Sequence, residues 1–192
     1  MPSIEDSSEN ASRADTARLL SAINFAAKKH RDQRRKDREA SPYINHPIEV
    51  ATTLANIGGV SDVTTLIAGV LHDTVEDTQT TPAELETAFG AEVRALVGEL
   101  TDDKGLPKAV RKQLQVDHAP HASNGAKLIK LGDKICNVRD VTHAPPTDWT
   151  TTRRREYFDW TERVVAGCRG TNVALERYYD ALLLAGRAAL DE

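Results

Sequence analysis

The chain has 192 residues, of which 40% are hydrophobic and 5% aromatic; this length suits one filled core and is short for two. Few aromatics beside many Ala, Leu and Val residues favour helix-on-helix packing and exclude an all-β fold. The 25 basic and 29 acidic side chains leave a net charge of −4, too mild for a protein that coats nucleic acid. We therefore expect a single all-α domain with no nucleic-acid partner.

The N-terminus and the cysteines indicate the compartment. No segment approaches the roughly 20 uninterrupted apolar residues of a membrane helix, and the polar first dozen residues lack the pattern of a secretion signal. Cys136 and Cys168 lie far apart and form no CxxC pair, so two reduced thiols in the core are expected. These features predict a cytoplasmic protein without a membrane partner.

The first segment divides into a tail and a helix. Residues 1–13 are rich in Ser, Glu and Asp and offer little to bury, which predicts a flexible tail before one domain over residues 14–192. From Ala14 onward, apolar residues recur at helical spacing up to the basic stretch KKHR, which predicts a helix. The next stretch lacks an apolar period and contains an SP dipeptide, so a loop or short hairpin is expected near residues 33–44.

Helices account for the remainder. Pro47 opens a helix directly after His46, and Ser61 is predicted to cap one continuous helix over residues 61–78, whose first half is apolar nearly all round. Thr81 begins a capping box for the helix that follows. Apolar periodicity predicts further helices over residues 91–103, 108–119, 126–141, 152–168 and 171–190. The total is an all-α bundle of about eight helices or more.

The polar end of the helix over residues 61–78 carries the most information. His72, Asp73, Glu76 and Asp77 place ionisable groups at the edge of the core, where charges are costly unless they are paired or bound to a cation. Acids at a helix C-terminus also oppose the helix dipole. On a continuous helix, His72 and Glu76 are i,i+4 neighbours, as are Asp73 and Asp77. This pattern fits a metal site, and it also fits a solvated helix end.

Two further residues are available as metal ligands. His46 lies at a helix entrance, and Asp133 lies midway through the apolar stretch AKLIKLGDKICNV, where an acid is disfavoured without a cation or a salt bridge. Lys130 and Lys134 offer the salt bridge as the ordinary explanation. Asn137 follows one turn after Asp133 and could hold a ligand or a substrate hydroxyl.

Six segments in order, HRDQRRKD, SPYINHP, VLHDTVEDT, ELTDDKGLPK, RKQLQV and KLGDKICNVRD, resemble the HD-domain alarmone hydrolases. This family comprises the hydrolase half of the RelA/SpoT enzymes and the free-standing small alarmone hydrolases, to which the resemblance is greatest. The resemblance runs from about Ala17 past Asn172. It implies an HD-domain helical bundle that removes the 3′-pyrophosphate from ppGpp or pppGpp, giving GDP or GTP and pyrophosphate.

The resemblance also implies roles for individual residues. One divalent ion per chain, usually Mn²⁺, would be bound by four ligands, and the acid pair that follows would orient or deprotonate the attacking water. The implied metal ligands are His46, His72, Asp73 and Asp133, and the implied catalytic pair is Glu76 and Asp77. Two such imidazoles and two carboxylates leave coordination positions open on an ion of the Mn²⁺ type. Spacing leaves open which acid removes the proton.

A polyanionic substrate needs a local basic patch on an acidic protein. Basic residues cluster over residues 34–38 and again on the helix after the TDDK stretch. Tyr43 is expected to pack on a base or to wedge the loop against the core. The substrate-binding candidates are therefore Arg35, Lys36, Tyr43, Lys108, Arg111 and Asn137.

The other conspicuous residues have simpler interpretations. Trp149 and Trp160 are expected to be core or interface anchors. The run of arginines at 153–155 is expected to be a solvated face, with contact to a substrate phosphate or a partner as the alternative. Most of the remaining histidines, at positions 30, 118, 121 and 143, are expected to be bystanders. Gly132 stands where relatives often carry Ala, which loosens a helix interior by about 1 kcal/mol.

Three alternative functions are considered, of which two retain the HD domain and one does not. The same metal site could serve a phosphatase of another nucleotide such as NADPH. A catalytically silent nucleotide-binding HD module would be expected to lack a ligand or an acid, and none is missing here. A plain helical interaction protein leaves the acids at the helix end unexplained. The final helix, with Tyr178, Tyr179 and residues Leu182–Leu184, is expected either to pack internally or to form a homodimer face.

Overall fold

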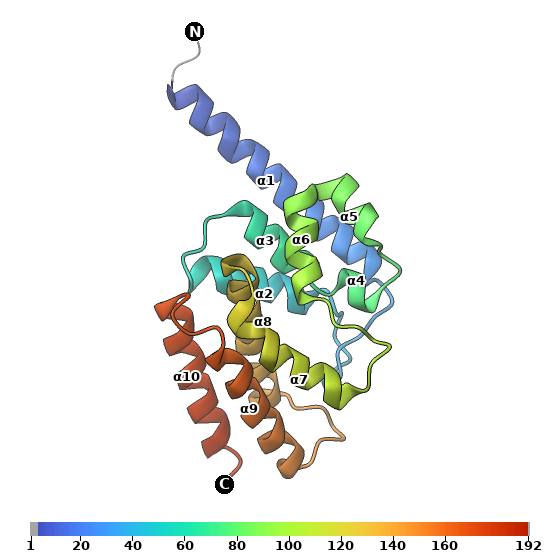
Figure 1. Cartoon of the computed structure of the whole chain (residues 1–192), viewed down its shortest axis with the longest axis vertical. Helices are drawn as coiled ribbons and strands as arrows, with labels where there is room; N and C mark the ends of the chain where they lie inside the picture. Colours follow the sequence, from blue (N-terminus) through green and yellow to red (C-terminus); the bar gives the residue numbers. More distant parts are fainter. Residues whose placement is uncertain (1–3, 192) are drawn as a thin grey trace.

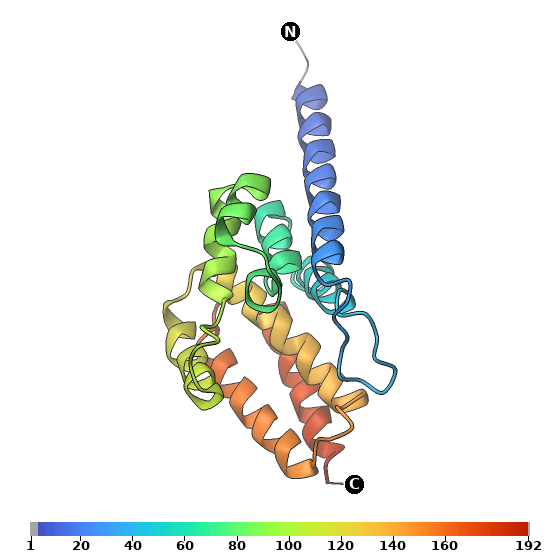
Figure 2. The same cartoon turned by 90° about the vertical axis from the view of Figure 1, so that its right-hand side faces the viewer.

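The computed structural model describes residues 4–191, and within this range the regular elements are helices together with one isolated antiparallel bridge between Arg34 and Pro42. The predicted all-α class is confirmed, and the bridge forms the hairpin expected near residues 33–44. Figures 1 and 2 show a helical bundle from which the N-terminal half of the first helix projects. The elements are α1 (Ile4–Lys29), α2 (Asn45–Asn56), α3 (Val63–Leu71), α4 (Thr74–Asp77), α5 (Pro82–Phe89), α6 (Ala91–Leu100), α7 (Lys108–His118), η1 (Ala119–His121), α8 (Asn124–His143), α9 (Thr151–Ala166) and α10 (Val173–Ala188).

Two helices form the centre of the bundle. α8 packs against α2, α3, α6, α9 and α10, and α3 packs against α1, α2 and α6 as well. Every residue of α3 from Ile67 to Leu71 is buried, as its nearly uniform apolar character predicts. The core around these helices is aliphatic, with Leu54, Leu131 and Ile135 fully buried. The polar residues at the end of α3 and in the middle of α8 are therefore brought to the same depth in the molecule.

The first helix extends further than predicted. It begins at Ile4 rather than near Ala14, so the predicted start of the helix is wrong. The flexibility expected of residues 1–13 stays a prediction, and residues 1–3 lie outside the described part. Ser, Glu, Asp and Ala tolerate a helix when neither Gly nor Pro interrupts it, so the helix propagates outward from its packed half. Its C-terminal half packs on the bundle through Ala22 and Ala26, which are fully buried.

The single helix predicted over residues 61–78 is also wrong, because the structure breaks it into α3 and α4. The ring nitrogen Nδ1 of His72 donates to the carbonyl of Gly69 at 2.7 Å, and the Thr74 hydroxyl donates to the carbonyl of Leu71 at 2.6 Å. These side chains occupy carbonyls that backbone N–H groups would otherwise bond, and such competition ends a helix. Asp73 takes φ −96° and ψ −3° at the junction. The break turns the consecutive side chains of His72 and Asp73 toward one site.

The helix caps agree with the sequence in one place and differ in another. The cap of α3 is Asp62 rather than Ser61, because its carboxylate accepts the N–H of Thr65 at 2.9 Å. The cap of α5 is Thr81 as predicted, and its hydroxyl accepts the N–H of Glu84 at 3.2 Å. Both are the side-chain acceptors that the open end of a helix requires.

The last helix packs largely inward. Tyr179 and Leu183 are buried, whereas Leu184 is exposed, so the homodimer face stays a prediction. Cys136 and Cys168 are buried and free, as expected. Among the described residues no helix combines the length and apolar character needed to cross a membrane.

Candidate functional site

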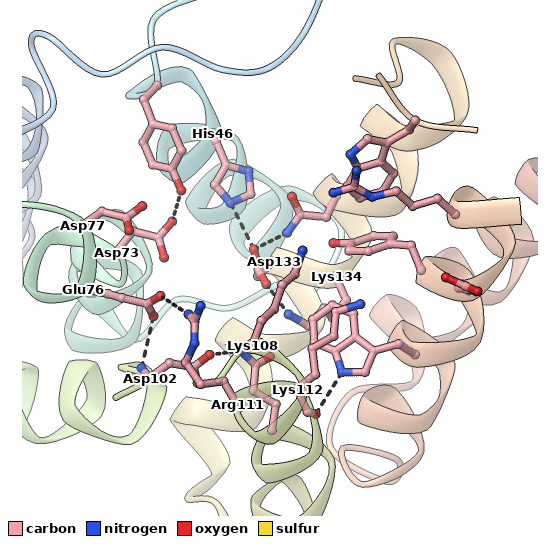
Figure 3. Close-up of a pocket in the computed structure, with 18 of the residues that line it drawn as sticks. His46, Asp73, Glu76, Asp77, Asp102, Lys108, Arg111, Lys112, Asp133 and Lys134 are labelled. Carbon is pink, nitrogen blue, oxygen red and sulfur yellow. Dashed lines mark hydrogen bonds and ion pairs between the residues drawn. The ribbon is translucent and has the colours of Figure 1, made fainter. Parts of the chain in front are cut away.

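Three helices meet at a cluster of metal-ligating side chains. His46 comes from the first turn of α2, His72 from the end of α3 and Asp133 from the middle of α8. Their ligand atoms all lie within 4.8 Å of one another. Nε2 of His46 lies 3.0 Å from Oδ1 of Asp133, and Nε2 of His72 lies 3.8 Å from the same oxygen. The structure thus brings together three of the four residues expected to bind a metal, and Figure 3 shows two of them, His46 and Asp133.

The imidazole of His72 is already oriented for a cation. Its Nδ1 donates to the Gly69 carbonyl, so the other ring nitrogen, Nε2, carries the lone pair. That Nε2 is buried and has no hydrogen-bond partner among the described residues. It lies close to two carboxylates, at 3.1 Å from Asp73 and 3.8 Å from Asp133, and a cation bound between these groups would satisfy the nitrogen and both acids.

Asp73, the fourth expected ligand, lies at the edge of the cluster. Its Oδ2 is 3.1 Å from Nε2 of His72 and accepts a hydrogen bond from the Tyr43 hydroxyl at 2.5 Å. Burial and the nearby charge of Asp73 raise the pKa of Tyr43, so its hydroxyl remains a donor. The side-chain hydrogen bond of Tyr43 is thus made to a candidate metal ligand, and the packing of its ring on a base stays a prediction.

Asp133 is held by two neighbours on its own helix. Its Oδ2 accepts from Nζ of Lys134 at 2.8 Å, and its Oδ1 accepts from Nδ2 of Asn137 at 2.6 Å. Burial alone would raise the pKa of Asp133, but Lys134 and the hydrogen bond from His46 outweigh it and hold the pKa well below its usual range. Of the two lysines that could explain a buried acid, Lys134 is the one paired with it.

The charges at the cluster favour a cation. Burial by itself would lower the pKa of His72, yet the Asp73 and Asp133 carboxylates raise it well above its usual value. The two carboxylates that favour a proton on the buried imidazole also attract a divalent ion, which would take the place of that proton on Nε2. Two imidazoles and carboxylate oxygens form a donor set suited to such an ion.

The predicted catalytic pair lies on α4, beside the cluster. Oε2 of Glu76 accepts the N–H of Asp102 at 3.1 Å, and Oε1 lies 3.6 Å from Nη1 of Arg111. Burial raises the pKa of Glu76, which moves this carboxylate toward the range useful for proton transfer at neutral pH. Asp77 is engaged on both oxygens, by the amide of Gln33 at 3.0 Å and by the ammonium of Lys104.

These groups line a pocket of about 680 Å³ whose walls carry opposite charges. Figure 3 shows Asp73, Glu76 and Asp77 along one side, with basic residues projecting from α7 on another. Of the substrate-binding candidates, Lys108 and Arg111 line this pocket together with Asn137 and Tyr43. An acidic wall beside a metal cluster, facing a basic wall, is suited to an anionic substrate.

A second pocket of about 490 Å³ adjoins the first and contains the remaining two candidates, Arg35 and Lys36. The Arg35 guanidinium pairs with Asp140 of α8 and lies 5.8 Å from the centre of the Tyr43 ring. Lys36 is exposed at the rim. Both pockets include the same residues at their junction, namely Tyr43, His46, Asp77, Asn137, Trp149 and Tyr157.

Several pocket residues were missed by the sequence analysis. Trp149 and Arg153 were assigned to the core or to a solvated face, but both line the larger pocket, as does Tyr157. The Arg153 guanidinium stacks 4.6 Å from the Trp149 ring centre. Lys112 also lines the pocket, with its ammonium 4.5 Å from the ring centre of Trp160. Arg153 and Tyr157 lie four residues apart on α9 and so share one face of that helix, which is the signal that would have revealed them.

Comparisons with known proteins agree with this geometry. Residues 22–159 match the HD domain family. Guanosine-3′,5′-bis(diphosphate) 3′-pyrophosphohydrolase MESH1 of Danio rerio is 54% identical over 171 residues, which are 89% of this chain and 95% of the relative. The Homo sapiens MESH1 is 56% identical over 163 residues, covering 85% of this chain and 91% of the relative.

Among solved structures, one described as a metazoan ortholog of SpoT that hydrolyzes ppGpp and plays a role in starvation responses has a TM-score of 0.84. The two sequences are 46% identical, and the match covers 86% of this chain and 93% of the chain in that structure. The predicted family is confirmed, and with the HD domain comes a divalent metal site, which His46, His72 and Asp133 form here. The chain belongs to the HD-domain family and, within it, to the MESH1 group of guanosine-3′,5′-bis(diphosphate) 3′-pyrophosphohydrolases.

Proposed function

We propose that this protein hydrolyses the 3′-pyrophosphate of ppGpp and pppGpp to GDP or GTP and pyrophosphate. The observation that carries the proposal is one pocket lined both by His46 and Asp133 of the metal-ligating cluster and by the cations Lys108 and Arg111 of α7. The relatives named for this activity match 89% and 85% of this chain. In the reaction, water attacks the phosphorus next to the ribose 3′-oxygen, the bond between them breaks, and the 3′-oxygen takes up a proton.

The residues at the cluster would divide the work. We propose that the bound ion is Mn²⁺ and that Asp73 is its fourth ligand. When bound, such an ion would lower the pKa of water and polarise a phosphoryl oxygen. Glu76 would accept the proton from the attacking water, because burial raises the pKa of its carboxyl group and so makes the carboxylate a stronger base. Asp77, held on both oxygens, would orient that water.

The basic wall would hold the substrate. Lys108 and Arg111 of α7 and Arg153 of α9 line the larger pocket and would bind the phosphates, since guanidinium and ammonium groups make charge-assisted hydrogen bonds to phosphate oxygens. The adjoining pocket, with Arg35 and Lys36 at its loop side, would receive the rest of the nucleotide. Tyr43 and Trp149 lie where the two pockets meet, and they offer aromatic faces to a purine.

The test is release of GDP and pyrophosphate from ppGpp by metal-stripped protein, with and without added Mn²⁺. The expected result is release that depends on the metal and is lost in His72→Ala. A parallel assay follows phosphate release from NADPH, which has a phosphorylated ribose and would meet the same cluster. If NADPH loses phosphate while ppGpp stays intact, the metal site serves an NADPH phosphatase and the proposal is refuted.

A further inference from the structure

Asp77 is fixed from two directions by residues far from it in the sequence. Nε2 of Gln33, in the loop after α1, donates to Oδ2 of Asp77 at 3.0 Å. Nζ of Lys104, in the loop between α6 and α7, pairs with Oδ1. Each carboxylate oxygen therefore has its own partner, and the two partners come from opposite ends of the site.

The amide of Gln33 is itself held by a histidine. Nδ1 of His30 lies 2.6 Å from Oε1 of Gln33. Because the Gln33 amide donates through Nε2, its Oε1 must accept, and we assign the shared proton to Nδ1 of His30. The ring is buried, packs 5.0 Å from the Tyr43 ring, and leaves its Nε2 without a partner among the described residues. His30 thus has one polar contact, and that contact orients Gln33.

The element that carries Asp77 cannot fix the side chain by itself. α4 spans only Thr74–Asp77, and Thr74 is its one buried residue. A helix of a single turn has little packing to restrict its side chains, and a catalytic group must be held within about 0.5 Å of its working position. The rigidity that α4 lacks is available from the partners in the two loops.

We propose that Gln33 and Lys104 are positioning residues for the hydrolysis, holding Asp77 against the pocket, and that His30 holds Gln33. The inference rests on the proposed function, in which Asp77 orients the attacking water. Neither residue lines the larger pocket, in contrast to Asp77 itself. Gln33 lines the adjoining pocket and Lys104 lines neither of the two, so the effect of both on the reacting phosphate would be exerted through Asp77.

The test measures kcat and KM for ppGpp in Gln33→Ala and Lys104→Met. The expected result is a fall in kcat of about 10-fold to 100-fold with KM changed less than about threefold, as for partners that orient a reacting group. Lys104→Arg, which keeps the cation, is expected to recover most of kcat. The control is Lys28→Met, which removes an exposed lysine of α1 and leaves both constants unchanged.

A double-mutant cycle distinguishes a positioning role of Lys104 from a merely structural one. If Lys104 acts through Asp77, Lys104→Met has little further effect once Asp77→Asn is present. The proposal would be overturned if the losses of kcat in the two single variants added up in the double variant, or if Lys104→Met raised KM and preserved kcat. The second outcome can be measured even if Asp77→Asn has no activity. Wild-type protein that leaves ppGpp intact in the same assay would refute the proposed function, a distinct outcome.

Discussion

The guanidinium of Arg153 lies 4.6 Å from the centre of the Trp149 ring, and both side chains line the larger pocket. Stacking leaves the in-plane N–H groups of a guanidinium available for hydrogen bonds, and Nη1 of Arg153 lies 3.4 Å from Oδ2 of Asp148. The stacked pair therefore presents an oriented cation to whatever occupies the pocket.

Replacing this cation tests its role in binding. We expect Arg153→Ala to raise KM for ppGpp about tenfold with a smaller effect on kcat, because an interaction made equally with substrate and transition state affects binding alone. Steady-state kinetics checks this. Arg155→Ala is the matched control, since Arg155 pairs with Asp191 at the end of the chain. Equal KM values in the two variants would contradict the assignment.

Removing a ligand should remove the metal. In His72→Ala we expect no bound Mn²⁺ after dialysis, and no rise in melting temperature when Mn²⁺ is added. Wild type should gain about 2.7 kcal/mol of stability when the free ion exceeds its Kd 100-fold. Metal analysis and thermal unfolding measure the two quantities. One equivalent of Mn²⁺ retained by the variant would show that His72 is not a ligand.

The hydroxyl of Tyr43 should affect metal affinity without touching the ion. Tyr43→Phe removes the donor to Asp73, and loss of such a partner weakens metal binding about 10-fold to 100-fold. Calorimetric titration of the metal-free protein with Mn²⁺ measures the change. Tyr178→Phe serves as control, because Tyr178 lies on α10 away from the pocket. Unchanged affinity in Tyr43→Phe would argue against this role.

The crossing of α8 and α10 depends on Gly186. A Cβ at this position would meet Oγ1 of Thr142 at 2.5 Å and the Phe158 ring at 3.0 Å, so Gly186→Ala should destabilise the fold by about 1–3 kcal/mol. At Gly98, on α6, a Cβ meets nothing within 4 Å, so Gly98→Ala should stabilise by about 0.5–1 kcal/mol through helix propensity. Urea unfolding should give opposite signs for the two, and a stabilising Gly186→Ala would refute the close crossing.

The cap of α3 should make stability depend on pH. Hydrogen bonds from the side chain and the backbone of Thr65 hold the pKa of Asp62 below its usual range. A lowered folded pKa stabilises the protein above the unfolded pKa of about 3.9, and this stabilisation disappears as the pH falls through the folded pKa. Asn caps a helix but does not titrate there. The difference in unfolding free energy between metal-free wild type and Asp62→Asn should therefore shrink below about pH 4; a difference independent of pH would contradict this.

The sequence predicted the class of fold and the residues of the cluster because those signals are local. Apolar periodicity marks α3 and α8 as central, and the isolated acid Asp133 stands out against the apolar residues around it. These two signals, together with the resemblance of six ordered segments, were enough to select His46 and His72 as the neighbours of Asp133. The roles of these residues stay predictions until they are measured.

Other features could not be predicted because they depend on tertiary contacts or on side-chain competition. The break between α3 and α4 arises from hydrogen bonds of His72 and Thr74 to carbonyls, which helical periodicity does not register. The placement of Arg153 in the pocket requires knowing how α9 faces α8. The contact between Gln33 and Asp77 joins segments 44 residues apart, and nothing in either segment alone indicates it.

The convergence of α2, α3 and α8 on His46, His72 and Asp133 links ion exchange to the motion of the bundle. Two of these three side chains are buried, and each is fixed to a different helix. For an ion to leave, either the ligands must release it one at a time into the pocket or the helix ends must separate. In the first case the ion would pass Glu76 and Asp77, which line the pocket. An anionic substrate that fills the pocket would block that route, so metal exchange should be slower in the substrate-bound protein than in the free one.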